Sequence, residues 1–283
     1  MKIAISAETT IDLTKELLDE FDIKTIAFNV MLGDKEGKDG DITREEIIDF
    51  VSKTKILPKT SALNQFQYTE FFEGLLKDYD AVIHFSLSSG LSSSCQNAIN
   101  ASKELKNVYV IDSQSLSTGI ALLAIYGRKL ANAGKSAKDI YNLCSERVNA
   151  VQASFELKRV DYLYKGGRCS ALALLGANIL KIRPQIIVKE GKMIAGKKYR
   201  GNFEHVVSNY CKDVLEQFDN PDLSVAFVTY TTASQEAIDI AVKHLEDRGF
   251  ENIYITRAGA TITSHCGEDT MGILYINDGE HNI

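Results

Sequence analysis

The sequence of 283 residues lacks several features that mark particular classes of protein. No apolar run approaches the roughly 18 residues that a membrane-spanning helix needs. The first residues, MKIAIS, enter a predicted strand without the apolar core of a signal peptide. The net charge is -6, whereas a surface that binds nucleic acid needs an excess of basic residues. We therefore expect a soluble cytoplasmic protein with no nucleic-acid partner.

Motifs of the common cofactor and metal sites are also missing. The five cysteines are scattered, and the closest two, Cys144 and Cys169, are 25 positions apart, which excludes CxxC and zinc-type spacings. There is no GxxxxGK[ST] motif and no GxGxxG after the first predicted strand. The sequence therefore predicts reduced thiols, no metal site and no bound cofactor.

What is present, in the first half of the chain, is a regular alternation of apolar runs and helical patterns. The predicted strands are 2–6, 23–32, 81–87 and 108–112. The predicted helices lie near 13–21, 44–51, 67–77 and 95–105, the second of them after a capping box at Thr43 and Glu46. Such alternation predicts a parallel sheet with helices on both faces. Ligands of such sheets bind beyond the carboxyl ends of the strands.

The second half begins after a helical stretch over 120–152. Further strands are predicted at 224–230, 252–256 and 271–276, with a hairpin over 183–198 that turns at Glu190 and Gly191. Helices are predicted at 171–180, 203–218 and 235–248, and a loop at 258–269. This pattern predicts two α/β domains, 1–155 and 156–283, the second built on a mixed sheet with helices.

Three hydroxyl-rich segments fall in predicted loops. They are Thr60-Ser61, the run SLSSGLSSS at 86–94, in which six of nine residues are serine, and the segment 261–265, which ends at His265. Helix capping explains about one hydroxyl for each helix. The remaining hydroxyls indicate a site for a carboxylate or a phosphate, because hydroxyls and helix N-terminal amides bind anions without adding a full charge.

Two alternatives stay open from these residues. A lipid hydrolase could use a serine of 92–94 with His265 as its base, although GLSSS at 90–94 has a serine where the GxSxG motif has its second glycine. The segment KGGR at 165–168 could be a helix end or a docking point for an anionic partner surface.

Eight short motifs, in order, carry a resemblance to a known family. They are KDGDI (38–42), KTS (59–61), SSGLSSSCQNA (88–98), DSQSLSTG (112–119), YLYKGGRCS (162–170), LKIRP (180–184), the pair Lys198 and Arg200, and SHCGEDTMG (264–272). Together they resemble the DegV family, which includes the fatty-acid-binding subunit of the bacterial fatty acid kinase. The resemblance covers nearly the whole chain.

The resemblance implies two α/β domains with a lipid tunnel between them and one bound long-chain fatty acid. The implied carboxylate contacts are Thr60, Ser61, Ser92, His265 and the backbone of Ser93. A separate kinase subunit with its own ATP site would phosphorylate the fatty acid, and Arg168 and Arg200 would meet that subunit. The chain would then be a substrate carrier and not an enzyme, with transient membrane contact. A carrier of another amphiphilic lipid is a further alternative.

The sequence departs from the family pattern at four places. The segment after Thr60-Ser61 reads Ala62-Leu63-Asn64, without the proline of the family's TSQPS. LSSS places Ser93 where the family has glycine, and a serine there would be strained if the position needs a positive φ. HCGED at 265–269 lacks a proline and a glycine and adds Glu268 and Asp269. Glu8 stands where the family has the aspartate of a TDS motif.

Overall fold

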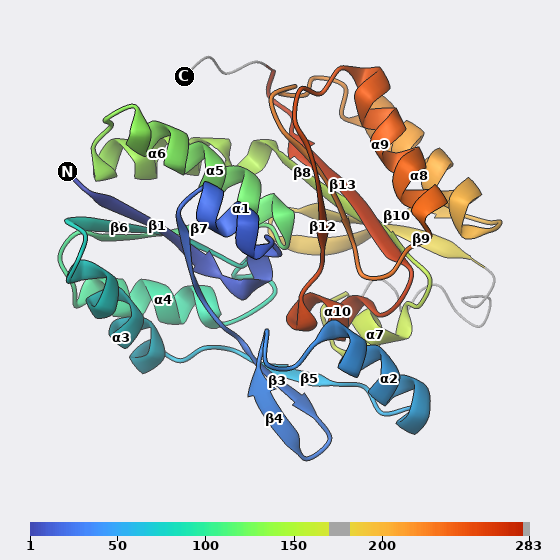
Figure 1. Ribbon diagram of the computed structural model, residues 1–283, viewed down its shortest axis with the longest axis horizontal. Coiled ribbons are helices and arrows are strands. Elements are labelled where there is room, and N and C mark those ends of the chain that lie inside the picture. The colour runs from blue at the N-terminus through green and yellow to red at the C-terminus, as the bar shows by residue number, and fades with distance from the viewer. Residues whose placement is uncertain (170–181, 280–283) are drawn as a thin grey trace.

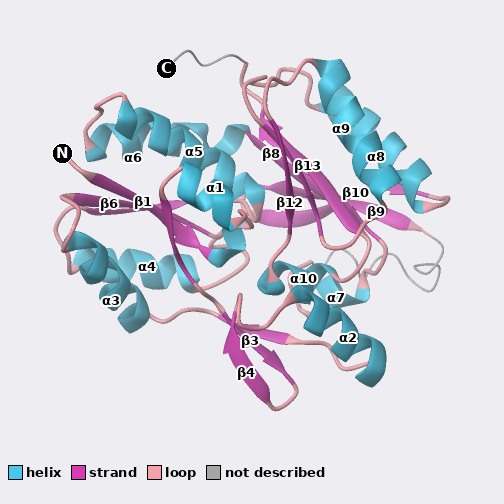
Figure 2. Cartoon of the chain, in the orientation of Figure 1, coloured by secondary structure: helices cyan, strands magenta, loops and turns pink. Residues whose placement is uncertain are grey.

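The computed structural model describes residues 1–169 and 182–279 of the chain. Two large sheets, each with its own helices, confirm the predicted pair of α/β domains (Figures 1 and 2). The helix predicted at 171–180 lies outside the described residues. No helix in the described ranges is long and apolar enough to cross a membrane.

The first domain is built on a parallel four-stranded sheet. Its strand order is β2 (Ile23–Ile26), β1 (Ile3–Glu8), β6 (Ala81–Ser86) and β7 (Val108–Asp112). Its helices are α1 (Lys15–Glu20), α3 (Gln65–Leu76), α4 (Ser94–Lys103), α5 (Thr118–Asn132) and α6 (Ala137–Arg147). Helices α3 and α4 lie on one face of the sheet, and α5 and α6 lie on the other (Figure 1). Every residue of β1 and β6 is buried, as expected of strands covered on both faces.

The predicted strand 23–32 is wrong as a single element. The chain leaves the large sheet after β2 and continues as β3 (Asn29–Leu32), which pairs antiparallel with β4 (Lys35–Lys38) and β5 (Lys59–Ser61). The polar segment GDKEGKDGD at 33–41 contains β4, and Gly33 turns the chain with a φ of 61°. This small sheet and α2 (Arg44–Thr54), whose capping box is confirmed, place Thr60 beside the second domain.

The second domain is built on a mixed six-stranded sheet. Its order is β10 (Lys192–Tyr199), β9 (Arg183–Lys189), β8 (Val151–Leu157), β13 (Thr270–Ile276), β11 (Ala226–Tyr230) and β12 (Ile253–Arg257). Helices α8 (Phe203–Gln217) and α9 (Gln235–Arg248) pack on it with their own apolar core. The predicted hairpin is confirmed, because β9 and β10 are antiparallel and Glu190 and Gly191 both have positive φ.

Two other boundaries differ from the prediction. The helical stretch expected to run to residue 152 ends with a short 3-10 turn at Val148–Ala150, and β8 begins at Val151, so the predicted border after residue 155 falls inside a strand. The predicted loop 258–269 contains a helix, α10 (Ala260–Cys266). Together with α7 (Asp161–Lys165) and α2, α10 forms a group below the second sheet in Figure 1.

The two sheets share one apolar core. Helix α5 contacts β1 and β6 of the first sheet and β8, β11 and β13 of the second. Eleven of its fifteen residues are buried, which explains the long apolar run in its sequence. Burying this helix between the sheets brings the carboxyl ends of β6 and β7 close to β5 and α10.

Candidate functional site

A narrow apolar cavity lies where the loop after β6 meets β5 and α10. Its volume is about 40 Å³. Three of the predicted site residues, Thr60, Ser92 and His265, line it, as does Arg168. The rest of the lining is Phe28, Ala62, Leu87, Leu91, Leu116, Met193, Thr261, Ile262 and Cys266. The lining is therefore mostly apolar and includes a few polar side chains.

A second cavity, of about 30 Å³, continues this space toward the second sheet. Leu116, Ile262 and Cys266 line both cavities. The second one reaches Phe155 of β8 and Leu274 of β13. Because the two cavities share three lining residues, they adjoin each other, and we call the two together the apolar path between the domains.

Thr60 and His265 are joined across the domain boundary. Thr60 Oγ1 lies 2.8 Å from His265 Nε2. The imidazole packs against the turn after α7, where a Cβ atom at Gly166 would lie 2.9 Å from His265 Nδ1. The first glycine of KGGR thus makes room for the imidazole. Gly167, with a φ of 74°, completes the end of α7, which confirms the helix-end interpretation of this segment.

The imidazole of His265 is neutral at pH 7. Burial and, as the smaller cause, the nearby charge of Arg168 together lower its pKa to about 4. Nδ1 is buried without a hydrogen-bond partner. Because a buried N–H without an acceptor is rarer than an unused acceptor, we assign the ring proton to Nε2, which then donates to Thr60 Oγ1. The Thr60 hydroxyl keeps its own proton for a ligand.

Ser92 is held by its neighbour Ser94. The Ser92 hydroxyl lies 3.1 Å from Ser94 Oγ and accepts from the Ser94 amide at 3.2 Å. Ser94 Oγ in turn accepts from the amide of Leu63, two residues after Ser61. These contacts tie the serine loop to the segment that carries Thr60.

Most other hydroxyls of the serine run have structural partners. Ser86 donates to Glu8, Ser88 donates to the carbonyl O of Gly191 at 2.7 Å, and Ser89 donates to Asp112. At the contact with Gly191, a Cβ atom on Gly90 would lie 2.4 Å from the carbonyl O. The interpretation that the whole run binds an anion is therefore too broad, because Ser92 carries the only hydroxyl of this run that lines the cavity.

Two aspartates that sequence reasoning missed hold the start of α10. Asp39 accepts from the amides of Ala260 at 2.8 Å and Thr261 at 3.0 Å. Asp12 accepts from the amide of Gly259 at 2.8 Å and from the Ser117 hydroxyl. Burial raises the pKa of Asp12 to about 8. Only the motif KDGDI gave a signal, since it contains Asp39.

Thr261 is a further polar group in the cavity wall. Its hydroxyl is buried, has no hydrogen-bond partner and belongs to the first cavity. A buried hydroxyl without a partner is uncommon in proteins. Thr261 is therefore a fourth candidate donor beside Thr60, Ser92 and His265.

Comparisons with known proteins give this site its context. The family model described as "Uncharacterised protein, DegV family" matches residues 2–278. The chain belongs to the DegV family.

Relatives of this DegV chain are described as fatty-acid-binding proteins. One, the "Fatty acid-binding protein" of Thermotoga maritima, is 30% identical over 96% of this chain and 96% of its own length. The structure of DegV from Bacillus subtilis, described as a fatty acid binding protein, has a TM-score of 0.85 and 26% identity over 98% of this chain and all of that one. A stearic-acid-binding protein from Eubacterium ventriosum has a TM-score of 0.85 and 25% identity over 98% of both chains.

The fold is also shared with more distant members of the family. A DegV family protein from Thermus thermophilus has a TM-score of 0.89 with 24% identity, covering 98% of this chain and 100% of that one. The arrangement of two α/β domains is thus common to DegV proteins of low sequence identity.

Of the other predicted residues of this DegV chain, Ser61, Ser93 and Arg200 do not line the cavity, whereas Arg168 does. Ser61 is exposed on β5, and Ser93 is exposed at the start of α4. Arg168 is half-buried at the cavity and donates to the carbonyl O of Gly166. Arg200 is exposed directly after β10 and lines neither cavity.

The departures from the family pattern are accommodated without backbone strain at Ser93. Its φ is −73°, so a serine is not disfavoured there. In the segment HCGED, the two added acids pair with Lys158, at 3.2 Å from Glu268 and 2.9 Å from Asp269. Asp269 has a φ of 49°, and its backbone amide donates a hydrogen bond to Thr232 Oγ1 at 2.8 Å.

Within the described ranges, no cluster of three or more His, Cys, Asp or Glu side chains could hold a metal ion.

Proposed function

We propose that this protein binds a long-chain fatty acid and presents its carboxylate to a separate kinase subunit. The acyl chain would occupy the path between the domains, and the carboxylate would meet Thr60, Ser92 and His265, with Ser61 and the Ser93 backbone nearby. The observation that carries the proposal is the apolar cavity whose lining includes Thr60, Ser92 and His265. Its relatives described as fatty-acid-binding proteins support it.

The tail alone does not explain selective binding. A chain of about 16 carbons gains roughly 0.8 kcal/mol for each buried methylene, or about 13 kcal/mol in total relative to water. A lipid bilayer offers nearly the same gain. Selection must therefore come from the shape of the path and from the polar groups at its mouth.

The polar groups suit a carboxylate that has to react. Thr60 and Ser92 can donate hydrogen bonds without a full charge, and the neutral His265, which donates to Thr60 Oγ1, leaves the Thr60 proton for the ligand. A bidentate arginine would instead bind both carboxylate oxygens strongly. The start of α4, directly after Ser93, adds helix N-terminal amides that favour an anion. One carboxylate oxygen then stays free as a nucleophile.

The reaction belongs to the partner, which supplies ATP. A carboxylate oxygen attacks the terminal phosphorus of ATP, a C–O–P linkage forms, and ADP leaves as the old P–O bond breaks. The product is an acyl phosphate. Arg168 at the cavity and Arg200 on the surface are our candidates for contact with the kinase subunit.

The hydrolase alternative has little support in the geometry. Nucleophilic catalysis needs a serine within hydrogen-bond reach of its base. Among the described residues, His265 Nε2 bonds to Thr60, and Ser92 bonds to Ser94. A carrier of another amphiphilic lipid remains an alternative that the mass of the ligand would distinguish.

Organic-solvent extraction of the purified protein followed by mass spectrometry tests the binding step. We expect one long-chain fatty acid for each chain. The proposal would be contradicted if no fatty acid were found after incubation with one, or if the protein turned over acyl esters.

In an assay with a fatty acid kinase subunit and ATP, Ser92→Ala and His265→Ala should lower phosphorylation more than lipid retention. Equal loss of both would show that these residues act only in binding.

A further inference from the structure

A groove opens beside the cavity, and every charged side chain in its lining is a cation. Its volume is about 390 Å³. Lys55 at the end of α2, Lys59 on β5, Lys165 on α7 and Arg168 supply the positive charge. The other lining residues are Leu57, Pro58, Thr60, Tyr162, Gly166, Ser264 and His265. No carboxylate belongs to this lining.

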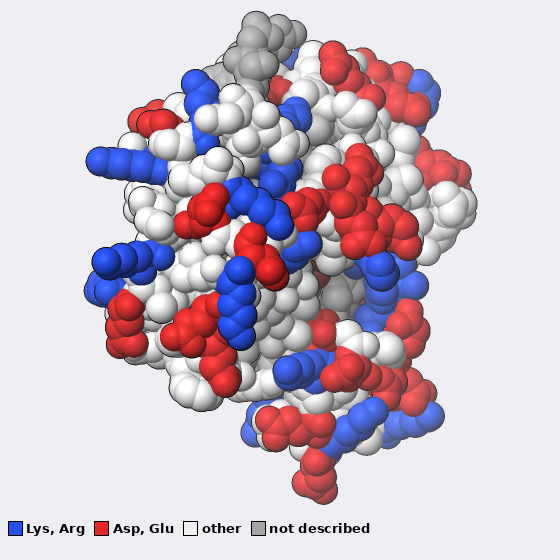
Figure 3. All heavy atoms as spheres, turned by 60° about the vertical axis from the view of Figure 1, so that its left-hand side comes forward, with Lys and Arg blue, Asp and Glu red and all other residues white. Residues whose placement is uncertain are grey.

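The cations of the groove are not neutralised by the protein. Among the described residues, none of Lys55, Lys59, Lys165 and Arg168 makes an ion pair; Lys55 donates to the carbonyl O of Ser52, and Arg168 to that of Gly166. The face shown in Figure 3 instead has acidic and basic side chains interspersed. In a chain with a net charge of -6, unpaired cations around one hollow indicate a site for an anion.

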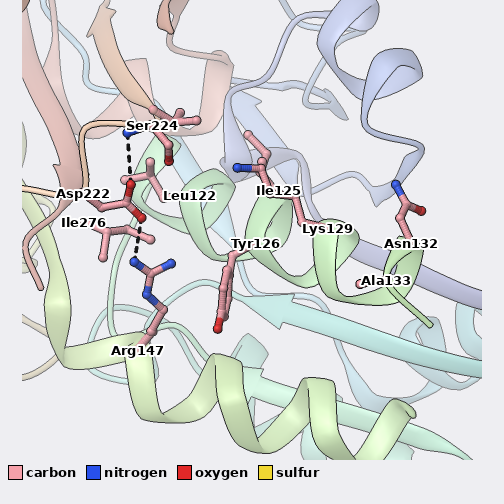
Figure 4. Close-up of a pocket in the computed structure, with 11 residues that line it drawn as sticks. Leu122, Ile125, Tyr126, Lys129, Asn132, Ala133, Arg147, Asp222, Ser224 and Ile276 are labelled. Carbon is pink, nitrogen blue, oxygen red and sulfur yellow. Dashed lines mark hydrogen bonds and ion pairs between the residues drawn. The ribbon is translucent and has the colours of Figure 1, made fainter. Parts of the chain in front are cut away.

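A larger hollow elsewhere in the protein shows the contrast. It has a volume of about 480 Å³ and lies beside α5, with Arg147 in its wall (Figure 4). Arg147 donates to Asp222 at 2.7 Å and to Asp278 at 2.8 and 2.9 Å, so its charge is already paired. That hollow has Asp222 in its own wall and, among the described residues, Lys129 as its one cation without an ion pair, whereas the groove beside Arg168 has four cations and no carboxylate.

The groove is continuous with the proposed carboxylate site. Thr60, Arg168 and His265 line both the groove and the first cavity. A group attached to a carboxylate held at Thr60 and His265 can therefore extend toward the lysines. The free carboxylate already has its neutral donors, which leaves the lysines for a second and more strongly charged group.

We infer that this groove is a second anion subsite, in which Lys55, Lys165 and Arg168 hold the phosphoryl group of an acyl phosphate. The inference rests on the proposed function. A phosphoryl group carries nearly two negative charges at pH 7, which matches the unpaired cations better than a carboxylate does. The subsite stabilises the product after the kinase has acted and keeps its reactive linkage next to the mouth of the cavity.

The test compares three ligands that share one tail. 2-Oxoheptadecyl phosphonate is a stable mimic of palmitoyl phosphate, because a methylene group replaces the bridging oxygen. 2-Heptadecanone lacks the phosphonate, and palmitate carries the carboxylate alone. Dissociation constants for each are measured for the wild type and for the double variant Lys55→Ala/Lys165→Ala.

We expect the double variant to bind the phosphonate about tenfold more weakly, since each exposed cation contributes up to about 1 kcal/mol. Palmitate and the ketone should bind within twofold of the wild type. Added salt should weaken binding of the phosphonate more than that of palmitate. The control Lys135→Ala/Lys138→Ala removes the same charge from two exposed lysines at the start of α6 and should change none of the three affinities.

The subsite would be overturned by an equal loss of phosphonate affinity in the control, or by an unchanged phosphonate affinity in the double variant. Binding of palmitate by the wild type would still support the proposed function in either case. Weaker binding of phosphatidylglycerol vesicles with an unchanged phosphonate affinity would assign the groove to membranes and also overturn it. If the wild type binds no palmitate, the proposed function itself fails, which is a different result.

Discussion

Glu8 and the pair Asp12 and Asp39 are buried carboxylates that hold two different segments of the lining of the same cavity. Glu8 lies in the first sheet and accepts from Ser86 at 2.7 Å and from the amide of Leu87 at 2.9 Å, where the serine loop begins. The two aspartates also belong to the first domain, but they accept amides of α10 more than 200 residues later. One centre fixes a loop within its own domain, and the other fixes a helix across the domain boundary.

The two centres differ in their charge balance. Burial opposes ionisation of Glu8, but the charge of His84 and hydrogen bonds from His84, Tyr68 and Ser86 lower its pKa overall. For Asp12, burial dominates over the donors Ser117 and Gly259 and raises the pKa to about 8. Glu8, which has several side-chain donors and a histidine around it, thus stays ionised at neutral pH. Asp12, which is held by one backbone amide and one hydroxyl, changes its protonation state near neutral pH.

Loss of Glu8 should have the largest effect on stability. Glu8→Ala leaves the Tyr68 hydroxyl, which lies 2.6 Å from Glu8, and His84 without their acceptor in a fully buried setting. We expect the free energy of unfolding in urea to fall by about 3–5 kcal/mol, as when one partner of a buried pair is removed. Glu8→Gln keeps the shape and should lose less; a loss below 1 kcal/mol for Glu8→Ala would show that the cluster is not a stabilising centre.

Asp39→Asn should affect ligand binding more than stability. The asparagine side chain has only one oxygen, so it can accept only one of the two hydrogen bonds that Asp39 accepts from the backbone amides of Ala260 and Thr261. The start of α10 therefore loses one hydrogen bond. We expect a loss of about 1–3 kcal/mol in unfolding free energy and weaker binding of palmitate, because α10 carries His265.

The control for this prediction is Glu156→Gln. Glu156 is a buried carboxylate on β8, paired with Arg183 at 3.4 Å, and it lines neither cavity. Its variant should leave palmitate binding unchanged. Equal weakening by both variants would mean that general destabilisation, and not the position of α10, controls affinity.

Local patterns in the sequence predicted the strands of both large sheets except β8, whose first residues fall in the predicted helical stretch over 120–152, and they predicted most helices. Each predicted element buries a run of apolar residues that the chain itself displays. The break in 23–32 could not be predicted, since the same apolar run serves two different sheets. Helix α10 was missed because amides at its start bond to Asp12 and Asp39, which are remote in sequence.

The candidate site was predicted in part for the same reason. Thr60, Ser92 and His265 were found through the family motifs, and the structure brings them to one cavity. The roles of Ser86, Ser88 and the buried carboxylates depend on partners that only the fold brings near. Composition alone suggested one anion site in the serine run, whereas the structure divides those hydroxyls between support and the cavity.

The smallest predicted effect is on the pH dependence, and it separates the two centres. Asp12 has a pKa of about 8 in the folded protein against 3.8 for the unperturbed group, so the folded state holds its proton more tightly than the unfolded state. Its contribution is therefore present at low pH and is lost as the pH rises from about 4 to about 8. The contribution of Glu8 has the opposite sign. Its lowered pKa stabilises the fold at pH values above the unperturbed pKa of the group, and this stabilisation is lost in acid.

Asp12→Asn mimics the protonated carboxyl, since its oxygen can accept from Gly259 and its amide can donate to Ser117. Urea unfolding at pH 6 and pH 7 should show the wild type losing about 1 kcal/mol relative to the variant over that unit, the full slope of one titrating group. Glu156, whose pKa burial also raises to about 8, titrates in the same window in both proteins and cancels from the difference. If the two curves stay parallel, Asp12 is ionised in the folded protein, and the contrast drawn between it and Glu8 disappears.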